Sequence, residues 1–214
     1  DAMLRLPYQQ RDISTPEAEG YFQAALRFYS QSRAAGQERI FIKADSWHLH
    51  FYTQLRRLFP AVPFFLLYRE PMGVILSQQR QRGIQSVPGM IEPEVLQLTQ
   101  EQGRDFNLDR YMAAVLEGFY RQMIRILRTD PLAFPLHYGD GMENNIRQLY
   151  QRLHLPINSR LATVFTERCR FDAKRPQQVF TEEKSGEAMP EFLTPALALY
   201  QQVAALSAND RSTL

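Results

Sequence analysis

The sequence offers few residues for covalent or metal cross-links. Its 214 residues include one cysteine, Cys169, and four histidines that are spread along the chain. A single cysteine excludes an internal disulfide, and dispersed histidines without further cysteines argue against a structural zinc site. We therefore expect a fold that depends on its hydrophobic core and a function that needs no metal.

Long apolar runs and dense clusters of basic residues are also missing. No uninterrupted apolar stretch approaches the about 20 residues of a membrane-spanning helix. The formal net charge is +2 and the isoelectric point is near 8.7, with lysines and arginines scattered along the chain. This weak basic bias suits an anionic ligand but lacks the basic stripe of a nucleic-acid-binding protein. We expect a cytoplasmic protein without a membrane span and without a nucleic-acid partner.

The composition predicts one helix-rich α/β domain over residues 1–214. With 44% apolar residues, a chain of this length can bury a substantial core. Caps and apolar residues at helical spacing predict helices. The predicted helices span residues 14–36, 94–99, 108–129 and 190–206. The broken, glycine- and proline-containing stretch 83–107 resembles the irregular segments that often serve as lids or binding loops.

Residues 62–77 are the most informative part of the chain. The β-branched and aromatic run 62–68 predicts a buried parallel strand, so Arg69 is expected at its carboxyl end. Pro71 suits the first position of a helix, and Ser77 lies two turns into that helix. Ligands of open α/β sheets bind at this edge, where a helix N-terminus offers free N–H groups. Arg69 and Ser77 therefore predict an anion site, most plausibly for a phosphate.

A second strand is predicted just upstream, over residues 39–48. The helix expected at residues 50–59 would connect it to the strand before Arg69. Such a β-α-β unit has a right-handed crossover, and it would bring Lys43 and Arg69 to the same edge of one sheet.

The segment from Arg69 to Ser77 resembles the 3'-phosphate-binding segment of sulfotransferases that use 3'-phosphoadenosine 5'-phosphosulfate (PAPS). In that family a strand ends in an arginine, a proline comes after it, and a serine lies eight residues after the arginine, as in this sequence. The resemblance implies that Arg69 and Ser77 bind the nucleotide's 3'-phosphate. It also implies an α/β fold of the P-loop type, a three-layer sandwich around a central parallel sheet.

The residues around Lys43 extend the resemblance. Family members carry a lysine-centred segment here, and many cytosolic members have a catalytic histidine where this chain has Asp45. Lys43, Asp45, Trp47 and His48 resemble the pattern Lys-x-Asp-x-Trp-His of a bacterial subgroup. The resemblance implies that Lys43 neutralises the bridging oxygen of PAPS, and that Asp45 or His48 removes the acceptor's proton. The alternative for His48 is a packing role against Trp47.

Two later segments resemble the family more loosely. Residues 134–141 read as a strand that ends in Tyr-x-Asp, and an amphipathic helix is expected next, over residues 145–157, although any β-α unit has this order. Lys184 and Gly186 are similar to the family's late basic loop that reaches the 3'-phosphate. Lys174 and Arg175 are rival candidates, and a solvated surface loop is the alternative for all of them.

The family's glycine- and serine-rich loop for the 5'-phosphosulfate is not found in the sequence. The chain begins at Asp1 with a segment that resembles the residues directly after this loop in the bacterial subgroup. We therefore expect an N-terminally truncated sulfotransferase domain that is inactive by itself. The cofactor implied by the resemblance is PAPS, with 3'-phosphoadenosine 5'-phosphate (PAP) as product and no metal.

The acceptor and two rival classes of function stay open. The expected acceptor is a hydroxyl or amine of a small molecule or glycan, and a sugar, a peptide tyrosine, a lipid and a small phenol all stay open. The choice is expected to depend on loops such as residues 83–107. A small-molecule kinase-like P-loop protein would need the same glycine-rich loop and a Mg²⁺ site. A non-catalytic nucleotide-binding or interaction module derived from this fold is the more serious rival.

Overall fold

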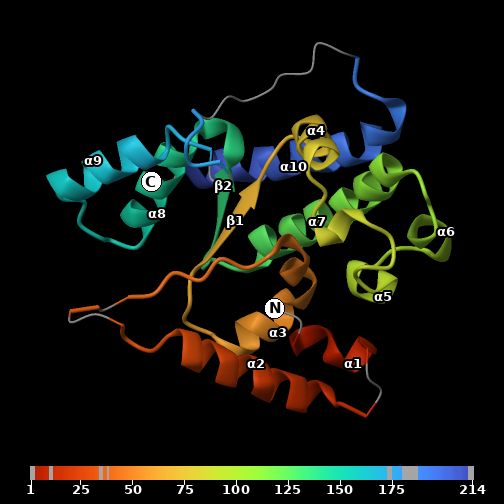
Figure 1. Ribbon diagram of the computed structural model, residues 1–214, viewed down its shortest axis with the longest axis horizontal. Coiled ribbons are helices and arrows are strands. Elements are labelled where there is room, and N and C mark those ends of the chain that lie inside the picture. Colours follow the sequence, from red (N-terminus) through yellow and green to blue (C-terminus); the bar gives the residue numbers. More distant parts are fainter. Residues whose placement is uncertain are drawn as a thin grey trace. The chain divides into compact units, whose positions relative to one another are not determined.

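The computed structural model shows a helix-rich α/β protein with a parallel sheet of two strands (Figure 1). It describes residues 3–9, 12–33, 36–37, 39–172, 175–179 and 188–211. The chain divides into two compact units: unit 1 comprises Asp1–Val62 and Gly83–Gln122, and unit 2 comprises Pro63–Arg82 and Met123–Leu214. The chain therefore passes between the units three times, the last time within one helix.

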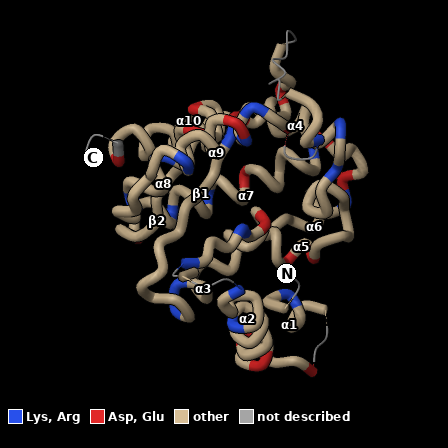
Figure 2. The backbone as a smooth tube through the Cα atoms, turned by 60° about the vertical axis from the view of Figure 1, so that its left-hand side comes forward, with Lys and Arg blue, Asp and Glu red and all other residues tan. Residues whose placement is uncertain are grey.

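The elements follow the same division, with η denoting a 3₁₀-helix. Unit 1 contains η1 (Met3–Arg5), α1 (Leu6–Gln9), α2 (Thr15–Tyr29), η2 (Ser46–Phe51), α3 (Tyr52–Leu58), η3 (Ile84–Ser86), α5 (Pro93–Leu96), α6 (Gln100–Gly103) and the first part of α7 (Leu108–Thr129). Unit 2 contains β1 (Phe64–Tyr68), α4 (Pro71–Arg80), the rest of α7, β2 (Ala133–His137), η4 (Tyr138–Asp140), α8 (Met142–Arg152), α9 (Ser159–Arg168), η5 (Glu191–Leu193) and α10 (Thr194–Arg211). Basic and acidic residues are interspersed along these elements (Figure 2).

The core of unit 1 forms around Trp47 of η2, which is fully buried. Leu96 of α5 and Val115 of α7 are equally inaccessible, and η2 packs against both α3 and α5. The guanidinium of Arg5 lies 5.4 Å from the centre of the Trp47 ring, and its Nε pairs with Oε2 of Glu92 at 2.8 Å. This buried ion pair joins the start of the chain to the segment before α5.

Helix α2 shows how local sequence signals set an element's start more firmly than its end. The Ser14 hydroxyl accepts from the Glu17 N–H, and a Glu17 carboxylate oxygen accepts from the Ser14 N–H at 2.8 Å, which forms the expected capping box. The helix ends at Tyr29 with Ser30 as its C-cap, so its predicted continuation to Gly36 is wrong. No tertiary packing extends the helix there, because Tyr29 is 64% exposed.

Helix α7 spans the predicted residues, 108–129. Its apolar residues at helical spacing predict a core stripe of Tyr111, Val115, Phe119, Met123 and Leu127. The first four are each at most 6% exposed, whereas Leu127 in the last turns is only half-buried. Apolar residues at every fourth position lie on one helix face, and burial of that face stabilises the helix.

The sheet of unit 2 pairs β1 with β2 in parallel, with Tyr68 opposite His137. Helix α10 packs against β2 and α4, and Tyr68 is only 4% exposed. Leu67, which points to the opposite face of β1, is 46% exposed. The prediction of a strand at this place is confirmed, but the strand is not buried on both faces.

The prediction of a strand over residues 39–48 is wrong. Residues 39–45 have no regular secondary structure, and η2 begins at Ser46. A strand needs a hydrogen-bonded neighbour, and in the sheet of the described residues β1 pairs with β2 alone. The apolar side chains of Ile40, Phe41 and Ile42 consequently stay 39%, 54% and 55% exposed, and the predicted β-α-β unit with Lys43 at its sheet edge is not formed.

Several other boundaries differ from the predictions. The strand expected within residues 134–141 is β2, which ends at His137, and the helix expected over residues 145–157 is α8, which ends at Arg152. The helix expected over residues 50–59 is α3, which begins at Tyr52 after η2.

The last helix, α10, runs from Thr194 to Arg211 rather than over residues 190–206. The stretch 83–107 contains η3, α5 and α6 where one short helix was predicted.

Candidate functional site

The predicted anion site lies in unit 2, where β1 passes into α4. Arg69 comes directly after the last residue of β1 and therefore stands at the carboxyl end of the strand, as predicted. Pro71 is the first residue of α4, as its fixed φ and missing N–H predicted. Because β1 and β2 are parallel, Arg69 and Tyr138 leave the sheet at the same edge.

The Arg69 guanidinium lies close to an aromatic ring and to a glycine. Its Cζ lies 4.5 Å from the centre of the Tyr138 ring, a cation–π contact. A Cβ placed on Gly73 would lie 2.9 Å from Nε and 3.2 Å from Cζ of Arg69. The arginine therefore packs against the first turn of α4, and it can do so because residue 73 has no side chain.

Ser77 shares the helix face that Arg69 covers. It lies four residues after Gly73, which places it one turn further along the same face of α4. Its side chain is half-buried. The two residues predicted to bind an anion are thus brought to one face of one helix, with a cation at its first turn and a hydroxyl at its second.

The N-terminus of α4 was predicted to offer free N–H groups to a ligand, and this prediction is wrong for two of them. The Glu70 carboxylate caps it: Oε1 accepts from the Met72 N–H at 3.0 Å and Oε2 from the Gly73 N–H at 2.8 Å. A carboxylate in this position also interacts favourably with the positive end of the helix dipole. An anion at this site would therefore be bound by the side chains of Arg69 and Ser77 rather than by free backbone N–H groups.

A carboxylate, an imidazole and a phenol are arranged in sequence beside this edge of the sheet. His137 Nδ1 lies 3.4 Å from Oδ1 of Asp140, and its Nε2 lies 3.0 Å from the Tyr200 hydroxyl. Gly139 allows the ring to lie over the turn, since a Cβ there would be 2.7 Å from His137 Cε1. Burial, together with the nearby Tyr68, Glu70 and Asp140, raises the pKa of Tyr200, so its hydroxyl stays protonated. These contacts fasten α10 to the end of β2.

The predicted catalytic residues belong to unit 1. Lys43 is exposed in the irregular segment before η2, and Asp45 is the half-buried N-cap of η2, without a side-chain capping bond. The Asp45 carboxylate therefore does not take part in capping η2.

His48 is enclosed, in contrast to Asp45. It is 4% exposed, and its ring stacks on Trp47 with the ring centres 3.8 Å apart. Nδ1 donates to the Asp45 carbonyl at 3.1 Å, and burial lowers the pKa of the imidazole. This is the packing role that the sequence left as the alternative for His48, and it makes Asp45 the less enclosed of the two predicted catalytic residues.

Of the candidate residues of the late basic loop, Arg175 alone belongs to the described part of the chain. Lys184, Gly186 and Lys174 lie outside the described residues. Arg175 is exposed in a turn, where its N–H donates to the Asp172 carbonyl at 3.1 Å.

Sequence reasoning missed the residues that hold Arg69 in place. Gly73 had a readable signal, because a glycine inside a helix costs stability and often marks a close approach of another group. The contact with Tyr138 had none, since it depends on the pairing of strands that are far apart in the sequence.

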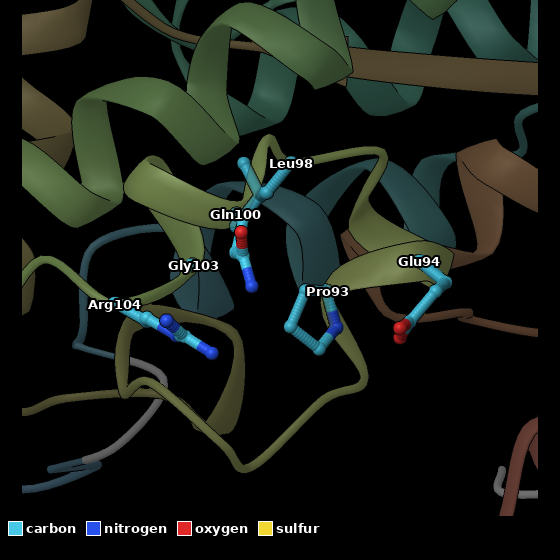
Figure 3. A pocket seen from close by; sticks show the side chains of 6 residues that line it. All are labelled: Pro93, Glu94, Leu98, Gln100, Gly103 and Arg104. Carbon is cyan, nitrogen blue, oxygen red and sulfur yellow. The ribbon is translucent and has the colours of Figure 1, made fainter.

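A pocket lies elsewhere, in the 83–107 stretch of unit 1 (Figure 3). It has a volume of about 410 Å³. Its lining residues are Pro93, Glu94, Leu98, Gln100, Gly103 and Arg104. It does not include the predicted phosphate-binding or catalytic residues.

Two features are absent from the described part of the chain. No group of three histidine, cysteine, aspartate or glutamate side chains there is arranged to hold a metal ion. No helix in the described ranges is long and apolar enough to cross a bilayer.

Comparison with known proteins finds no relative of this chain. The chain matches no protein-family model, no curated protein and no solved structure. The site is therefore interpreted from its own residues and geometry.

Proposed function

We propose that the chain is a PAPS-dependent sulfotransferase domain in which Arg69 and Ser77 bind the 3'-phosphate of the nucleotide. The observation that carries the proposal is the placement of both residues on one face of α4, beyond the carboxyl end of a parallel strand. The arginine fork can donate two parallel hydrogen bonds to a phosphate, and the serine hydroxyl can donate a third.

The proposal extends to the fold and to the chemistry. The parallel β1–β2 pair would belong to the central sheet of a P-loop-type three-layer sandwich. Lys43 would neutralise the bridging oxygen of PAPS as the sulfuryl group leaves, and Asp45 would take the proton from the attacking hydroxyl or amine. The half-buried position of Asp45 at the N-cap of η2, without a side-chain capping bond, supports this choice of base over the enclosed His48.

The electrostatics of the site favour a ligand that has more than one anchor. Glu70 lies beside Arg69 in the sequence and, as the cap of α4, adds negative charge near the proposed phosphate. Arg69 and Ser77 must offset this repulsion, so a 3'-phosphate by itself would bind weakly. A nucleotide that makes additional base and ribose contacts can bind tightly despite the carboxylate.

Two rival functions make different predictions for ligand binding. A small-molecule kinase-like P-loop protein would prefer ADP to PAP. A non-catalytic interaction module would bind neither nucleotide. Preference for a 3'-phosphorylated adenosine separates the proposed function from both.

The test is calorimetric titration of the chain with PAP and, separately, with ADP. We expect PAP to bind more tightly than ADP, because only PAP carries the phosphate that Arg69 and Ser77 would hold. The double variant Arg69→Ala, Ser77→Ala should lose about ten- to a hundred-fold in PAP affinity, the effect of removing charge-assisted hydrogen bonds. Binding is the appropriate readout, because the sequence has no glycine-rich loop for a 5'-phosphosulfate.

Matched variants separate a specific effect from a general one. Arg128→Ala removes an exposed arginine from the last turn of α7 and should leave PAP affinity unchanged. Arg69→Lys keeps the charge but loses the fork, so its affinity should lie between those of the wild type and the double variant. Equal affinities for PAP and ADP, or full PAP affinity in the folded double variant, would contradict the proposal.

A further inference from the structure

A hydrogen-bonded cluster of three side chains joins the last helix of unit 2 to the turn that contacts Arg69. The Tyr200 hydroxyl of α10 lies 3.0 Å from His137 Nε2 at the end of β2, and His137 Nδ1 lies 3.4 Å from Asp140 Oδ1 in η4. Helix α10 packs against both β2 and α4 (Figure 1). All of these elements belong to unit 2, so the cluster and the anion site share one compact body.

The cluster determines which nitrogen of His137 carries the proton. A neutral imidazole has one N–H and one lone pair. Burial and nearby charges raise the pKa of Tyr200, so its hydroxyl is protonated and can donate to Nε2. The proton of the imidazole then lies on Nδ1, where it faces the Asp140 carboxylate. The other tautomer would place the lone pair of Nδ1 against that carboxylate, so the two partners of the imidazole select the same arrangement.

The turn is held on both sides of Tyr138. His137 precedes Tyr138 and Asp140 lies two residues after it, and the two flanking side chains are in contact. The His137 ring lies over Gly139, where a Cβ would be 2.7 Å from its Cε1. The Asn145 side chain of α8 donates to the His137 carbonyl at 2.9 Å. These contacts fix the turn, and with it the direction in which Tyr138 projects.

The Tyr138 ring is the surface against which Arg69 lies. The Arg69 Cζ is 4.5 Å from the ring centre, and both residues are half-buried. A shift of the turn would move the ring and with it the guanidinium, which must be aligned to donate two parallel hydrogen bonds to a phosphate. The series of contacts that begins at Tyr200 and passes through His137 therefore ends at the proposed phosphate-binding group.

We propose that Tyr200 is a positioning residue for the anion site, which acts through His137 and Tyr138 and does not touch the ligand. The inference rests on the proposed function, since the ligand concerned is the 3'-phosphate of the nucleotide. Tyr200→Phe removes the donor to Nε2 and keeps the aromatic ring, whose centre lies 5.9 Å from that of Tyr68 and 6.0 Å from that of His137. This variant therefore tests the hydroxyl without removing the packing of α10.

The experiment begins with an NMR comparison of the wild type and Tyr200→Phe, using the whole chain without nucleotide. At about pH 8, where histidine side chains are generally neutral, we expect the ring nitrogens of His137 to show the Nδ1–H tautomer in the wild type and a larger share of the Nε2–H tautomer in the variant. The Arg69 Nε–H signal, which the ring current of Tyr138 shifts upfield, should move toward that of a solvated arginine. Tyr21→Phe removes an exposed hydroxyl from α2 and should change neither signal.

Calorimetric titration with PAP then connects the cluster to the ligand. Tyr200→Phe should bind PAP about three- to ten-fold more weakly, the effect of one neutral hydrogen bond. In a Tyr138→Leu background the same change should have no further effect, because the hydroxyl acts through the Tyr138 ring. A purely structural role of Tyr200 would give the same loss in both backgrounds.

Four results would each overturn the proposal. They are an unchanged tautomer of His137, an unmoved Arg69 signal, an unchanged PAP affinity of Tyr200→Phe, and an equal loss of affinity with and without the Tyr138 ring. A wild type that binds no PAP would contradict the proposed function instead, and the two NMR signals would still decide whether Tyr200 positions Arg69.

Discussion

Glu70 and Arg69 are neighbours in the sequence with opposite effects on a bound anion. The two carboxylate oxygens of Glu70 occupy the N–H groups of Met72 and Gly73, which a phosphate could otherwise use. The Arg69 guanidinium lies against the Tyr138 ring and Gly73, and its positive charge can compensate an anion for the loss of these N–H groups. In the proposed function, recognition of an anion at this edge would therefore depend on side chains, whose geometry is more selective than a helix dipole.

At the residue scale, His50 makes the stability of the fold depend on pH. Both of its ring nitrogens are buried without a hydrogen-bond partner, and burial lowers the pKa of the imidazole from 6.5 to about 4. Between pH values of about 4 and 6.5, His50 is therefore protonated in the unfolded chain and neutral in the folded chain. The free energy of unfolding should fall by about 3 kcal/mol as the pH falls from about 6.5 to about 4. His50→Gln cannot titrate, so urea unfolding at several pH values should show a correspondingly smaller fall.

The control for this change is another histidine. His154 is exposed and has a φ of 50°, a backbone conformation that asparagine tolerates. His154→Asn should therefore retain the pH dependence of the wild type. Other groups with shifted pKa values are present in all three proteins, so their contributions to the pH dependence cancel in the comparison. These groups include the carboxylates of Glu92 and Asp105, whose pKa values are lowered, and the buried His48. An unchanged slope in His50→Gln would show that His50 is protonated as readily in the folded chain as in the unfolded one.

At the scale of elements, Gly73 links the stability of α4 to ligand binding. Gly73→Ala should favour the helix by up to about 1 kcal/mol, because alanine has the higher helix propensity. The same Cβ would displace the Arg69 guanidinium, which lies 2.9 Å from its position. We expect a variant that is at least as stable as the wild type in thermal unfolding and yet binds PAP about ten-fold more weakly.

Gly20 of α2 provides the matched control. A Cβ at Gly20 would meet no atom within 4 Å, so Gly20→Ala should give the helix-propensity gain alone. Its PAP affinity should equal that of the wild type. If Gly73→Ala also kept full affinity, the contact between Arg69 and the first turn of α4 would be irrelevant to the site.

The elements that could be predicted from sequence are those whose signals are local. Helix α7 is predicted by its apolar periodicity, and the start of α4 is predicted by Pro71 after an apolar run. Ser14 and Glu17 predict the start of α2 in the same way. In each case the residues that determine the element lie within a few positions of it.

The features that could not be predicted depend on partners distant in the sequence. Residues 39–45 have a strand-like composition but no strand to pair with in the described sheet, so the composition alone misleads. In the candidate site, the order of Arg69, Pro71 and Ser77 predicts the end of the strand and the start of the helix. The sequence does not predict that Glu70 caps this helix, because that depends on the rotamer its side chain adopts. The Tyr200 partner of His137 comes from α10, more than sixty residues later, and no local pattern indicates it.

At the scale of the whole molecule, both units are built from separated segments. Unit 2 takes β1 and α4 from residues 63–82 and the remainder from residues 123–214. A fragment of residues 123–214 would retain β2 and α10 without the strand and helix on which they pack. We expect this fragment to unfold without a cooperative transition when it is followed by circular dichroism.

Restoring the missing segment provides the control. Residues 63–82, joined through a flexible linker to residues 123–214, supply β1 and α4 again and should recover a sigmoidal transition. A sigmoidal transition in the fragment 123–214 alone would show that the β1–β2 pairing contributes little to the stability of unit 2.

The parallel pairing of β1 with β2 also has a consequence for synthesis of the chain. Strand β1 ends at Tyr68 and its partner begins at Ala133, about 65 residues later. At translation rates of about 5–20 residues per second, synthesis of β1 is complete roughly 3–13 s before synthesis of its partner begins. During that interval the apolar segment Phe64–Tyr68 is an unpaired edge on a nascent chain, and it is the place where a ribosome-associated chaperone would be expected to bind.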